Sequence, residues 1–428
     1  MGFIKRIRET AFLKEHFGSM MLLLLVSLPI GQQLLTNIVM LILFLLALTL
    51  ADKSDWRRTL RSPIFILPSL FYLFSWLSLL WSDNIAAALP MLETKSSFLL
   101  APLLIGLSVR FYSLGFKEKA LKAFLLGSLL ASLIALLYAT FRSVENGHLY
   151  KLAQDGVSKQ YLFLYTHLAE PIMHPGYFAS FLGIGFFIAC YFFLKRDKRR
   201  FLYLGAAAFL FVMMLLLQAR INLLAILMLL PPAFVYWAFK SRSYKLLLLP
   251  LVPAIALVAA LTLGGESLRD RYLQLPDFSY DISGTDFNSA TYRLAEWESA
   301  AALIADNFWI GTGFGDNRDA LIETYRAKQF WEGLSKRYNA HNQYLESFIA
   351  IGLVGLSLLL LSLFYYLIAF WKKGDYLNVL NLLFLMICLL TESMFERMWG
   401  ILLFTLFFPL MMYLSEDKQR DLDWYKFL

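Results

Sequence analysis

Cysteine and charge are both scarce in this chain of 428 residues. The two cysteines, Cys190 and Cys388, lie inside apolar runs, so we interpret them as small core side chains rather than disulfide or zinc ligands. Charged residues make up 16% of the sequence, whereas hydrophobic residues make up 59%. Soluble domains carry charge on roughly a quarter of their residues. The composition therefore excludes an ordinary soluble protein.

Signatures of nucleotide chemistry are also missing. The sequence has no P-loop, and no local motif assembles a Ser/His/Asp nucleophile. The formal net charge is +8, but the basic residues stand in short clusters between apolar runs. That distribution is typical of membrane loops rather than of a nucleic-acid-binding surface. We expect no nucleic-acid partner, no metal and no cofactor.

Long apolar runs are what the chain has in abundance. A helix needs about 20 mostly apolar residues to cross the hydrocarbon core of a bilayer. The runs cover approximately residues 17–31, 33–51, 63–82, 90–109, 120–140, 173–194, 201–218, 221–239, 246–264, 343–370, 376–392 and 398–414. We therefore predict an all-α polytopic membrane protein with about 12 transmembrane helices.

Clusters of lysine and arginine predict how the spans are oriented across the membrane. They occur at residues 5–14, 53–61, 110–122, 195–200, 240–245, 372–373 and 418–426. These are alternate connections between the predicted spans, and positively charged short loops stay in the cytoplasm. Both termini are therefore predicted to be cytoplasmic, in contact with membrane lipids on the inner side.

Two longer polar segments then face outward, residues 141–172 and 265–342. The second holds 8 basic and 12 acidic residues, which suits the outer side. The chain thus divides into three parts. They are residues 1–264 with nine spans, residues 265–342 as a large loop of amphipathic helices, and residues 343–428 with three spans and a cytoplasmic tail.

Arg220 is the first candidate for a functional charge. It lies between two apolar spans with almost no loop. An arginine beside hydrocarbon is costly, and those that are tolerated there usually pair or serve function. The structural alternative is an arginine that extends to the lipid headgroups.

Arg293 lies in a segment with helical periodicity within the large loop. The apolar residues that recur at helical spacing are Leu294, Trp297, Ala301 and Ile304. We predict an amphipathic helix capped by Ser289 or Thr291. Arg293, Glu296 and Trp297 then lie near one another. The structural alternative is an Arg–Glu pair on a solvated face.

A glycine-rich segment follows that predicted helix. Gly311, Gly313 and Gly315 resemble a phosphate-binding loop only superficially, because a helix and not a strand precedes them. We predict that these glycines end the helix and turn the chain back toward the membrane.

His341 marks the point where the large loop meets the next span. Its unperturbed pKa near neutrality suits proton transfer, whereas the structural alternative is a lone interfacial histidine. Asn342 is expected to cap the following helix or to orient the imidazole. Tyr344 and Glu346 follow on that helix.

His167, Glu170 and His174 form a second group, at the entrance to a span. Two imidazoles and a carboxylate suggest a metal, but Pro171 and Pro175 break the helical geometry. A turn with His174 facing an outer cavity is the favoured interpretation.

Charged residues also interrupt apolar runs at Lys95 and at Glu392, Glu396 and Arg397. Such residues are expected to face protein or a water-filled cleft. The charges around Lys95, Arg220 and Arg397 are predicted to converge on one anionic ligand. Pairing with acidic neighbours is the alternative for each.

The order of these motifs resembles the O-antigen ligase and polymerase superfamily. The motifs are Arg220 before a span, R-L-x-x-W from Arg293 to Trp297, G-x-G, H-N-x-Y-L-E from His341, and G-L-V-G from Gly352 to Gly355. Motif agreement covers residues 218–356, and the topology extends the resemblance to most of the chain. One departure is Asn307-Phe308-Trp309, where relatives often have a proline before the glycine-rich turn.

The resemblance implies a metal-independent, inverting glycosyltransferase of the bacterial inner membrane with its active site on the periplasmic face. The donor would be a glycan on a polyprenyl diphosphate, and the acceptor most directly the lipid A-core. His341 would activate the acceptor hydroxyl, and Arg220 and Arg293 would bind the donor diphosphate. Further substrate contacts are predicted at Lys95, His174, Trp297, Asn342, Tyr344, Glu392 and Arg397.

Three alternatives stay open. Within the same superfamily they are an O-antigen polymerase and a protein O-oligosaccharyltransferase. From a different class, a polysaccharide exporter or flippase would need a continuous polar path through the membrane. The sequence has no internal repeat, and its polar content is concentrated in two outer loops, which disfavours a transporter.

Overall fold

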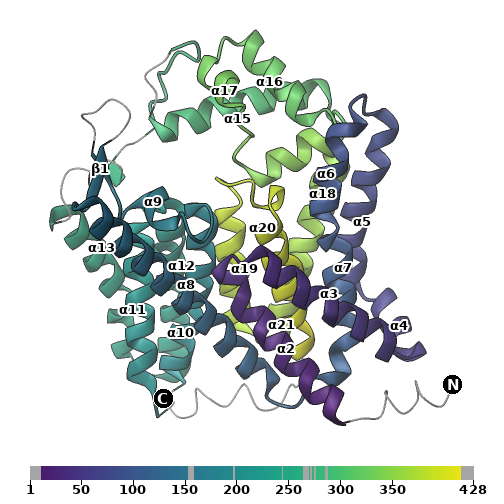
Figure 1. Cartoon of the computed structure of the whole chain (residues 1–428), viewed down its shortest axis with the longest axis vertical. Coiled ribbons are helices and arrows are strands. Elements are labelled where there is room, and N and C mark those ends of the chain that lie inside the picture. The colour runs from purple at the N-terminus through teal and green to yellow at the C-terminus, as the bar shows by residue number, and fades with distance from the viewer. Residues whose placement is uncertain are drawn as a thin grey trace.

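The computed structural model is a helical bundle with a layer of helices across one end (Figure 1). It describes residues 11–152, 159–195, 198–242, 244–263, 269, 272–273, 276–284 and 288–415. The strands within these ranges are β1 (Tyr150–Leu152) and β2 (Lys159–Tyr161), which pair antiparallel with Tyr150 opposite Tyr161. Apart from this small hairpin, the predicted helical fold class is confirmed.

Seven of the described helical segments are long and apolar enough to cross a membrane. They are α3 (Gln33–Leu50), α5 with η1 (Pro63–Leu77, Ser78–Trp81), α6 with α7 and η2 (Ile85–Lys95, Ser97–Ser108, Val109–Phe111), α8 (Phe116–Asn146), α10 (Pro175–Leu194), α12 (Arg220–Ser241) and α18 (Gln343–Lys373).

Five further apolar helical segments are shorter. They are the His16–Ile30 part of α2 (Ala11–Ile30), α11 (Arg200–Leu216), α13 (Leu251–Leu263), α19 (Tyr376–Cys388), and α20, η5 and α21 (Met398–Leu402, Leu403–Phe407, Phe408–Leu414). The short connecting elements are α4 (Lys53–Leu60), α9 (Tyr165–Ala169), η3 (Tyr244–Leu248) and η4 (Met394–Glu396). These helices occupy the predicted apolar runs, and twelve membrane crossings stay a prediction.

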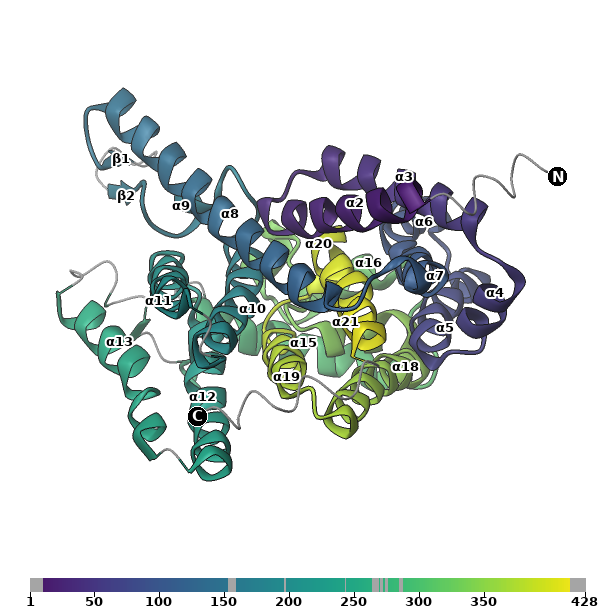
Figure 2. The same cartoon turned by 90° about the horizontal axis from the view of Figure 1, so that it is seen from below.

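Close helix contacts hold the bundle together. Gly127 of α8 faces Val26 of α2, and a Cβ at Gly127 would lie 2.3 Å from the Val26 carbonyl oxygen. Only a residue without a side chain permits this approach. α8 also packs on α10, α10 packs along α11, and α18 packs along α5. α13 lies at the edge of the bundle beside α11 (Figure 2).

The large loop forms a separate layer, made of α15 (Ser289–Asp306), α16 (Asn317–Ala327) and α17 (Trp331–Lys336). We call it the loop layer, and the bundle end beneath it the loop end. The predicted amphipathic helix is confirmed as α15. The predicted cap is wrong, because the Asn288 side chain accepts from the N–H groups of Ala290 and Thr291.

The buried face of α15 also differs from the predicted one. Leu294 and Trp297 are only half-buried and Ala301 is exposed. The face that packs inward instead carries Thr291, Ala295, Glu296, Ser299, Ala300, Leu303 and Ile304. The helix is therefore turned so that a carboxyl group points into the protein.

α18 is broken near its start, where Gly352 has a φ of 63°. This left-handed conformation favours glycine. The break frees the carbonyl groups of Ile349 and Ala350, which accept hydrogen bonds from the N–H groups of Thr312 and Gly313 at 2.9 and 3.1 Å. The glycine-rich turn thus docks on α18. Its predicted role in ending the helix is wrong, because α15 ends at Asp306 with Asn307 as its C-cap, before the first of these glycines. The turn back toward the membrane stays a prediction.

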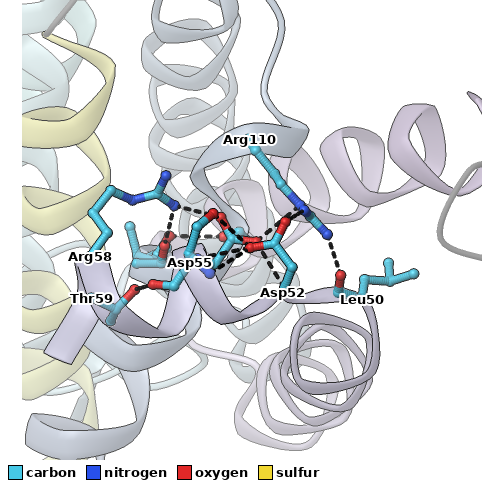
Figure 3. Close-up of polar contacts among 10 residues, drawn as sticks. Leu50, Asp52, Asp55, Arg58, Thr59 and Arg110 are labelled. Carbon is cyan, nitrogen blue, oxygen red and sulfur yellow. Dashed lines mark hydrogen bonds and ion pairs between the residues drawn. The ribbon is translucent and has the colours of Figure 1, made fainter.

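A group of charged residues joins α3, α4, α7 and η2 (Figure 3), away from the loop layer in Figure 1. Arg110 contacts Asp52, Asp55 at 3.1 Å and the Leu50 carbonyl. Arg58 bonds Asp55 at 3.0 Å and a carbonyl of α7 at 3.1 Å. We call Asp52, Asp55, Arg58 and Arg110 the corner clamp. It lies among two of the basic clusters that predict the cytoplasmic side.

Candidate functional site

Three elements meet around His341 at the loop end. α15 contributes Arg293 and Glu296, the segment before α18 contributes His341, and the turn after α19 contributes Glu392. We call these four residues the His341 cluster. The structure thus brings together three predicted site residues that the sequence separates by up to 99 positions.

Arg293 lies on the first turns of α15 and points toward the turn after α19. Its guanidinium donates to the Glu392 carboxylate at 2.8 Å and lies 3.9 Å from Glu296. The Arg293 side chain is 26% exposed, so it is partly buried but still accessible to solvent. The predicted proximity of Arg293 and Glu296 is confirmed, but Glu296 is buried rather than solvated.

His341 lies between the two carboxyl groups of the cluster. Its Nε2 is 3.8 Å from Glu296 and its Nδ1 is 3.8 Å from Glu392. Both distances exceed hydrogen-bonding range. Nδ1, unlike Nε2, is fully buried without a hydrogen-bond partner. The residue has a φ of 43°, a strained conformation that a functional constraint commonly explains.

Burial lowers the pKa of the His341 imidazole below its usual value. The Glu392 carboxylate opposes that effect and the Arg293 guanidinium adds to it. The net direction keeps the imidazole neutral near neutral pH. A neutral imidazole is the form that can accept a proton.

The two carboxyl groups of the cluster titrate in opposite directions. Burial raises the pKa of Glu296 well above that of an ordinary glutamate, so it keeps its proton. Burial also opposes ionisation of Glu392, but His341 and Arg293 outweigh it and lower the pKa of that carboxyl. The surroundings therefore favour the protonated form of Glu296 and the charged form of Glu392.

A hydrogen-bonded frame holds His341 and Glu392 in place. Asn342 caps α18 by accepting from the N–H groups of Tyr344 and Leu345, as predicted. Its own N–H donates to the Ser393 hydroxyl at 3.2 Å. The Gln343 side chain accepts from the Phe395 N–H at 2.6 Å. The start of α18 is thus tied to the turn that carries Glu392.

Arg220 begins α12 and donates to the hydroxyl of Ser289, the first residue of α15. Ser289 and Arg293 are one helical turn apart and so lie on the same side of α15. The guanidinium of Arg220 therefore lies on the side of α15 from which Arg293 projects. The connection between α11 and α12 is short, as the sequence predicts.

His174 borders the cluster at the start of α10. Its Nδ1 accepts from the Gly176 N–H at 3.3 Å, and its ring stands edge-on to Tyr177. Burial lowers the pKa of His174, and Glu392, His341, Arg293 and Arg397 all act on it electrostatically. Arg397 is exposed at the same end. Both predicted contacts thus lie in the surroundings of the cluster.

Lys95 serves a different purpose from the predicted one. Its side chain is 2% exposed, and its ammonium donates to Glu396 at 2.6 Å and to the Phe395 carbonyl at 2.7 Å. Pairing with an acidic neighbour, the alternative for this residue, is what the structure has. Of the two predicted surroundings, protein and a water-filled cleft, Lys95 therefore faces protein, and it ties α6 to the turn after α19.

Trp297 and Tyr344 complete the predicted set. Trp297 is half-buried, and its indole N–H is buried without a hydrogen-bond partner. The Tyr344 hydroxyl donates to the Met386 carbonyl at 2.9 Å and so ties α18 to α19.

The suggested metal group is not assembled. His167 bonds Gln160 at 3.1 Å, whereas His174 caps α10. Among the residues that the structure describes, no three His, Cys, Asp or Glu side chains are grouped so that they could hold a metal ion.

Sequence reasoning missed Glu296 as a site residue. Helical spacing places Glu296 near Arg293, but it does not show that the carboxyl group is buried. The predicted apolar face ran through Leu294, Trp297 and Ala301, whereas the buried face carries Glu296.

Residues 205–360 match a family model described as O-antigen ligase. This confirms the predicted resemblance to the ligase and polymerase superfamily. The matched stretch includes Arg220, Arg293 and His341. A search of curated proteins gave no match. Residues 205–360 are thus similar to O-antigen ligases, and the seven long apolar helices support a multi-pass membrane protein.

Proposed function

From the family match over residues 205–360, we propose a glycosyltransferase that moves a glycan from a polyprenyl diphosphate to an acceptor sugar. Ligation of O-antigen to the lipid A-core at the periplasmic face is the reaction that fits best. The observation that carries the proposal is the His341 cluster. It places a neutral imidazole beside a guanidinium that already binds an anionic oxygen.

The arginines suit a diphosphate donor. A guanidinium stays charged and binds phosphate oxygens through two N–H groups at once. The 2.8 Å bond from Arg293 to Glu392 supports an anionic oxygen at this position. Arg220 would bind from the start of α12. The positive charge would stabilise the diphosphate as it leaves.

An apolar cavity below Arg220 suits the polyprenyl chain. It measures about 310 Å³ and lies between α12 and the segment from η3 to α13. Its lining residues are Leu227, Pro231, Val235, Leu247, Pro250, Leu251 and Ala254. Leu227 follows Arg220 by two helical turns, so the diphosphate at Arg220 would lie above the chain in the cavity.

His341 would act as the general base. Nε2 takes the proton from the acceptor hydroxyl while that oxygen attacks the anomeric carbon. The bond from this carbon to the diphosphate breaks, and its electron pair stays on the diphosphate oxygen. One direct displacement inverts the anomeric centre.

Reconstitution tests this function. Protein in liposomes, supplied with a polyprenyl diphosphate-linked oligosaccharide and lipid A-core, is expected to form glycosylated core and free polyprenyl diphosphate. Absence of both products from folded protein would refute the proposal. Product that requires an added divalent ion would refute metal independence.

A deletion strain separates the alternatives. A ligase loses all glycan on the lipid core, whereas a polymerase leaves a core with a single repeat unit. Unmodified glycoproteins would indicate a protein O-oligosaccharyltransferase. Glycan that accumulates on the cytoplasmic side would indicate an exporter.

A further inference from the structure

Glu392 stands between the two groups that the proposed reaction needs. One of its oxygens accepts from Arg293 at 2.8 Å, and the other lies 3.8 Å from Nδ1 of His341. The Glu392 side chain is 13% exposed. The Glu392 carboxylate therefore bonds Arg293 and lies just beyond hydrogen-bonding distance of His341.

Nδ1 of His341 is the atom left unsatisfied by this arrangement. It is buried and has no hydrogen-bond partner. A buried polar atom without a partner is costly, and an imidazole base works best when a carboxylate fixes its second nitrogen. A shift of about 1 Å would bring the Glu392 oxygen within hydrogen-bonding range of Nδ1.

We propose that Glu392 is a positioning residue that changes partners when the donor binds. It holds Arg293 while the site is empty, and it turns to the Nδ1–H of His341 when phosphate oxygens take its place at Arg293. This inference rests on the proposed function. It makes donor binding the event that prepares the base.

The exchange balances charge and protons. Phosphate replaces carboxylate at Arg293, so the guanidinium keeps an anionic partner. When Nε2 accepts the acceptor proton, Nδ1–H remains bonded to Glu392, and the carboxylate offsets the imidazolium charge. The other titratable or charged groups around the imidazole are the carboxyl of Glu296, the ring of Tyr338 at 5.7 Å, His174 and the more distant Arg318.

Glu392→Gln tests the exchange in the full-length reconstituted protein. The kcat is expected to fall at least about tenfold, because the imidazolium loses its counter-charge. The KM for donor is expected to fall, because Arg293 loses its internal competitor. The acid limb of the kcat–pH profile is expected to move to lower pH, since the carboxylate raises the pKa of His341.

Glu392→Asp keeps the charge and is expected to restore the position of the acid limb. Glu298→Gln is the matched control, because Glu298 lies on α15 but pairs with Lys328 away from the cluster. An unmoved acid limb, or a donor KM that rises, would overturn the exchange. If the wild type makes no product, the proposed function fails. If it does and Glu392→Gln behaves like it, only the exchange fails.

A second inference concerns Phe308, Trp309 and Ile310, which follow α15 and are 42%, 69% and 47% exposed. Their backbone is fixed, because the Leu353 N–H of α18 donates to the Phe308 carbonyl at 2.9 Å. Three adjacent exposed apolar side chains on a rigid turn are unusual on a surface that faces water.

The turn lies level with the end of a spanning helix. The N–H groups of Phe314 and Gly315 donate to the hydroxyls of Ser78 and Ser82, where α5 and η1 end. Leu77 and Leu80 there are also exposed. We infer that the segment Phe308–Ile310 inserts into the interface of the adjacent lipid leaflet, where aromatic residues are favoured.

Trp309→Phe and Trp331→Phe form a matched pair, because Trp331 is also exposed but lies on α17. The emission of each tryptophan is the difference between wild-type and variant fluorescence in liposomes. We expect doxyl-labelled phospholipid to quench the emission of Trp309 at least about twofold more strongly than that of Trp331. If aqueous iodide quenches the emission of Trp309 and the labelled lipid does not, the inference that this segment inserts into the membrane is refuted.

Discussion

The corner clamp and the His341 cluster use the same kinds of side chain in opposite ways. In the clamp, Arg58 and Arg110 share Asp55 at 3.0 and 3.1 Å, and each also bonds a backbone carbonyl. In the cluster, a single contact is short, between Arg293 and Glu392 at 2.8 Å.

The contacts that remain in the His341 cluster are long. They measure 3.8 to 3.9 Å, and a nitrogen of His341 and an oxygen of Glu296 are buried without hydrogen-bond partners. Buried polar groups are nearly always satisfied, so exceptions call for an explanation. The clamp is complete by itself, whereas the cluster retains bonding capacity that a substrate could use.

Removing the base should have the largest effect. We expect His341→Ala to lower transfer about 10²- to 10⁴-fold, the usual contribution of a general base. The measurement is product formation in liposomes at equal protein level. His148→Ala is the control, because His148 is an exposed histidine on the small hairpin. Near-normal transfer by His341→Ala would show that His341 is not the base and that the cluster, like the clamp, has only a structural role.

Arg293→Lys should have the next largest effect. The charge remains but the two-pronged guanidinium is lost, so we expect transfer to fall roughly tenfold, mainly through a higher donor KM. Arg326→Lys is the control, since Arg326 is 58% exposed and pairs with Glu323 on its own helix. If lysine functions as well as arginine at position 293, bidentate phosphate binding there is wrong.

Breaking the clamp should reduce stability but not catalysis. Arg110→Ala leaves the buried Asp55 with Arg58 and the Asp52 N–H as partners, and lost hydrogen bonds to charged groups cost about 2 kcal/mol. We expect a lower midpoint in thermal unfolding of the detergent-solubilised protein, with kcat per folded molecule unchanged. A lost kcat in fully folded Arg110→Ala would show that the clamp and the cluster are coupled.

The sequence predicted much of the bundle because apolar runs and basic clusters are local signals. It also singled out His341 and Arg220, because each is a polar residue at the edge of an apolar run, and Arg293, because it lies in a periodic segment of the large loop. It could not predict the pairing of Lys95 with Glu396 or of Asp52 with Arg110, which tertiary packing brings together.

Glu296 was missed for a related reason. Helical periodicity predicts that α15 has a buried face, but apolar and small residues occur all around this helix. The docking of the loop layer on α18 decides which side is buried. That contact joins residues far apart in the chain, so the local pattern could not place the carboxyl group.

The smallest expected effect concerns pH and separates the two regions once more. Hydrogen bonds from Ser54 and from the Asp55 N–H, together with Arg110, lower the pKa of Asp52 from 3.8 to about 2. A depressed folded-state pKa stabilises the protein above pH 4, and this contribution is lost as pH falls from about 4 to 2. Asp52→Asn should remove that part of the acid sensitivity in thermal unfolding. Activity should instead follow His341, whose lowered pKa keeps the base neutral to a lower pH than an ordinary histidine. If Asp52→Asn shifts the acid limb of activity, the clamp and the cluster are not independent.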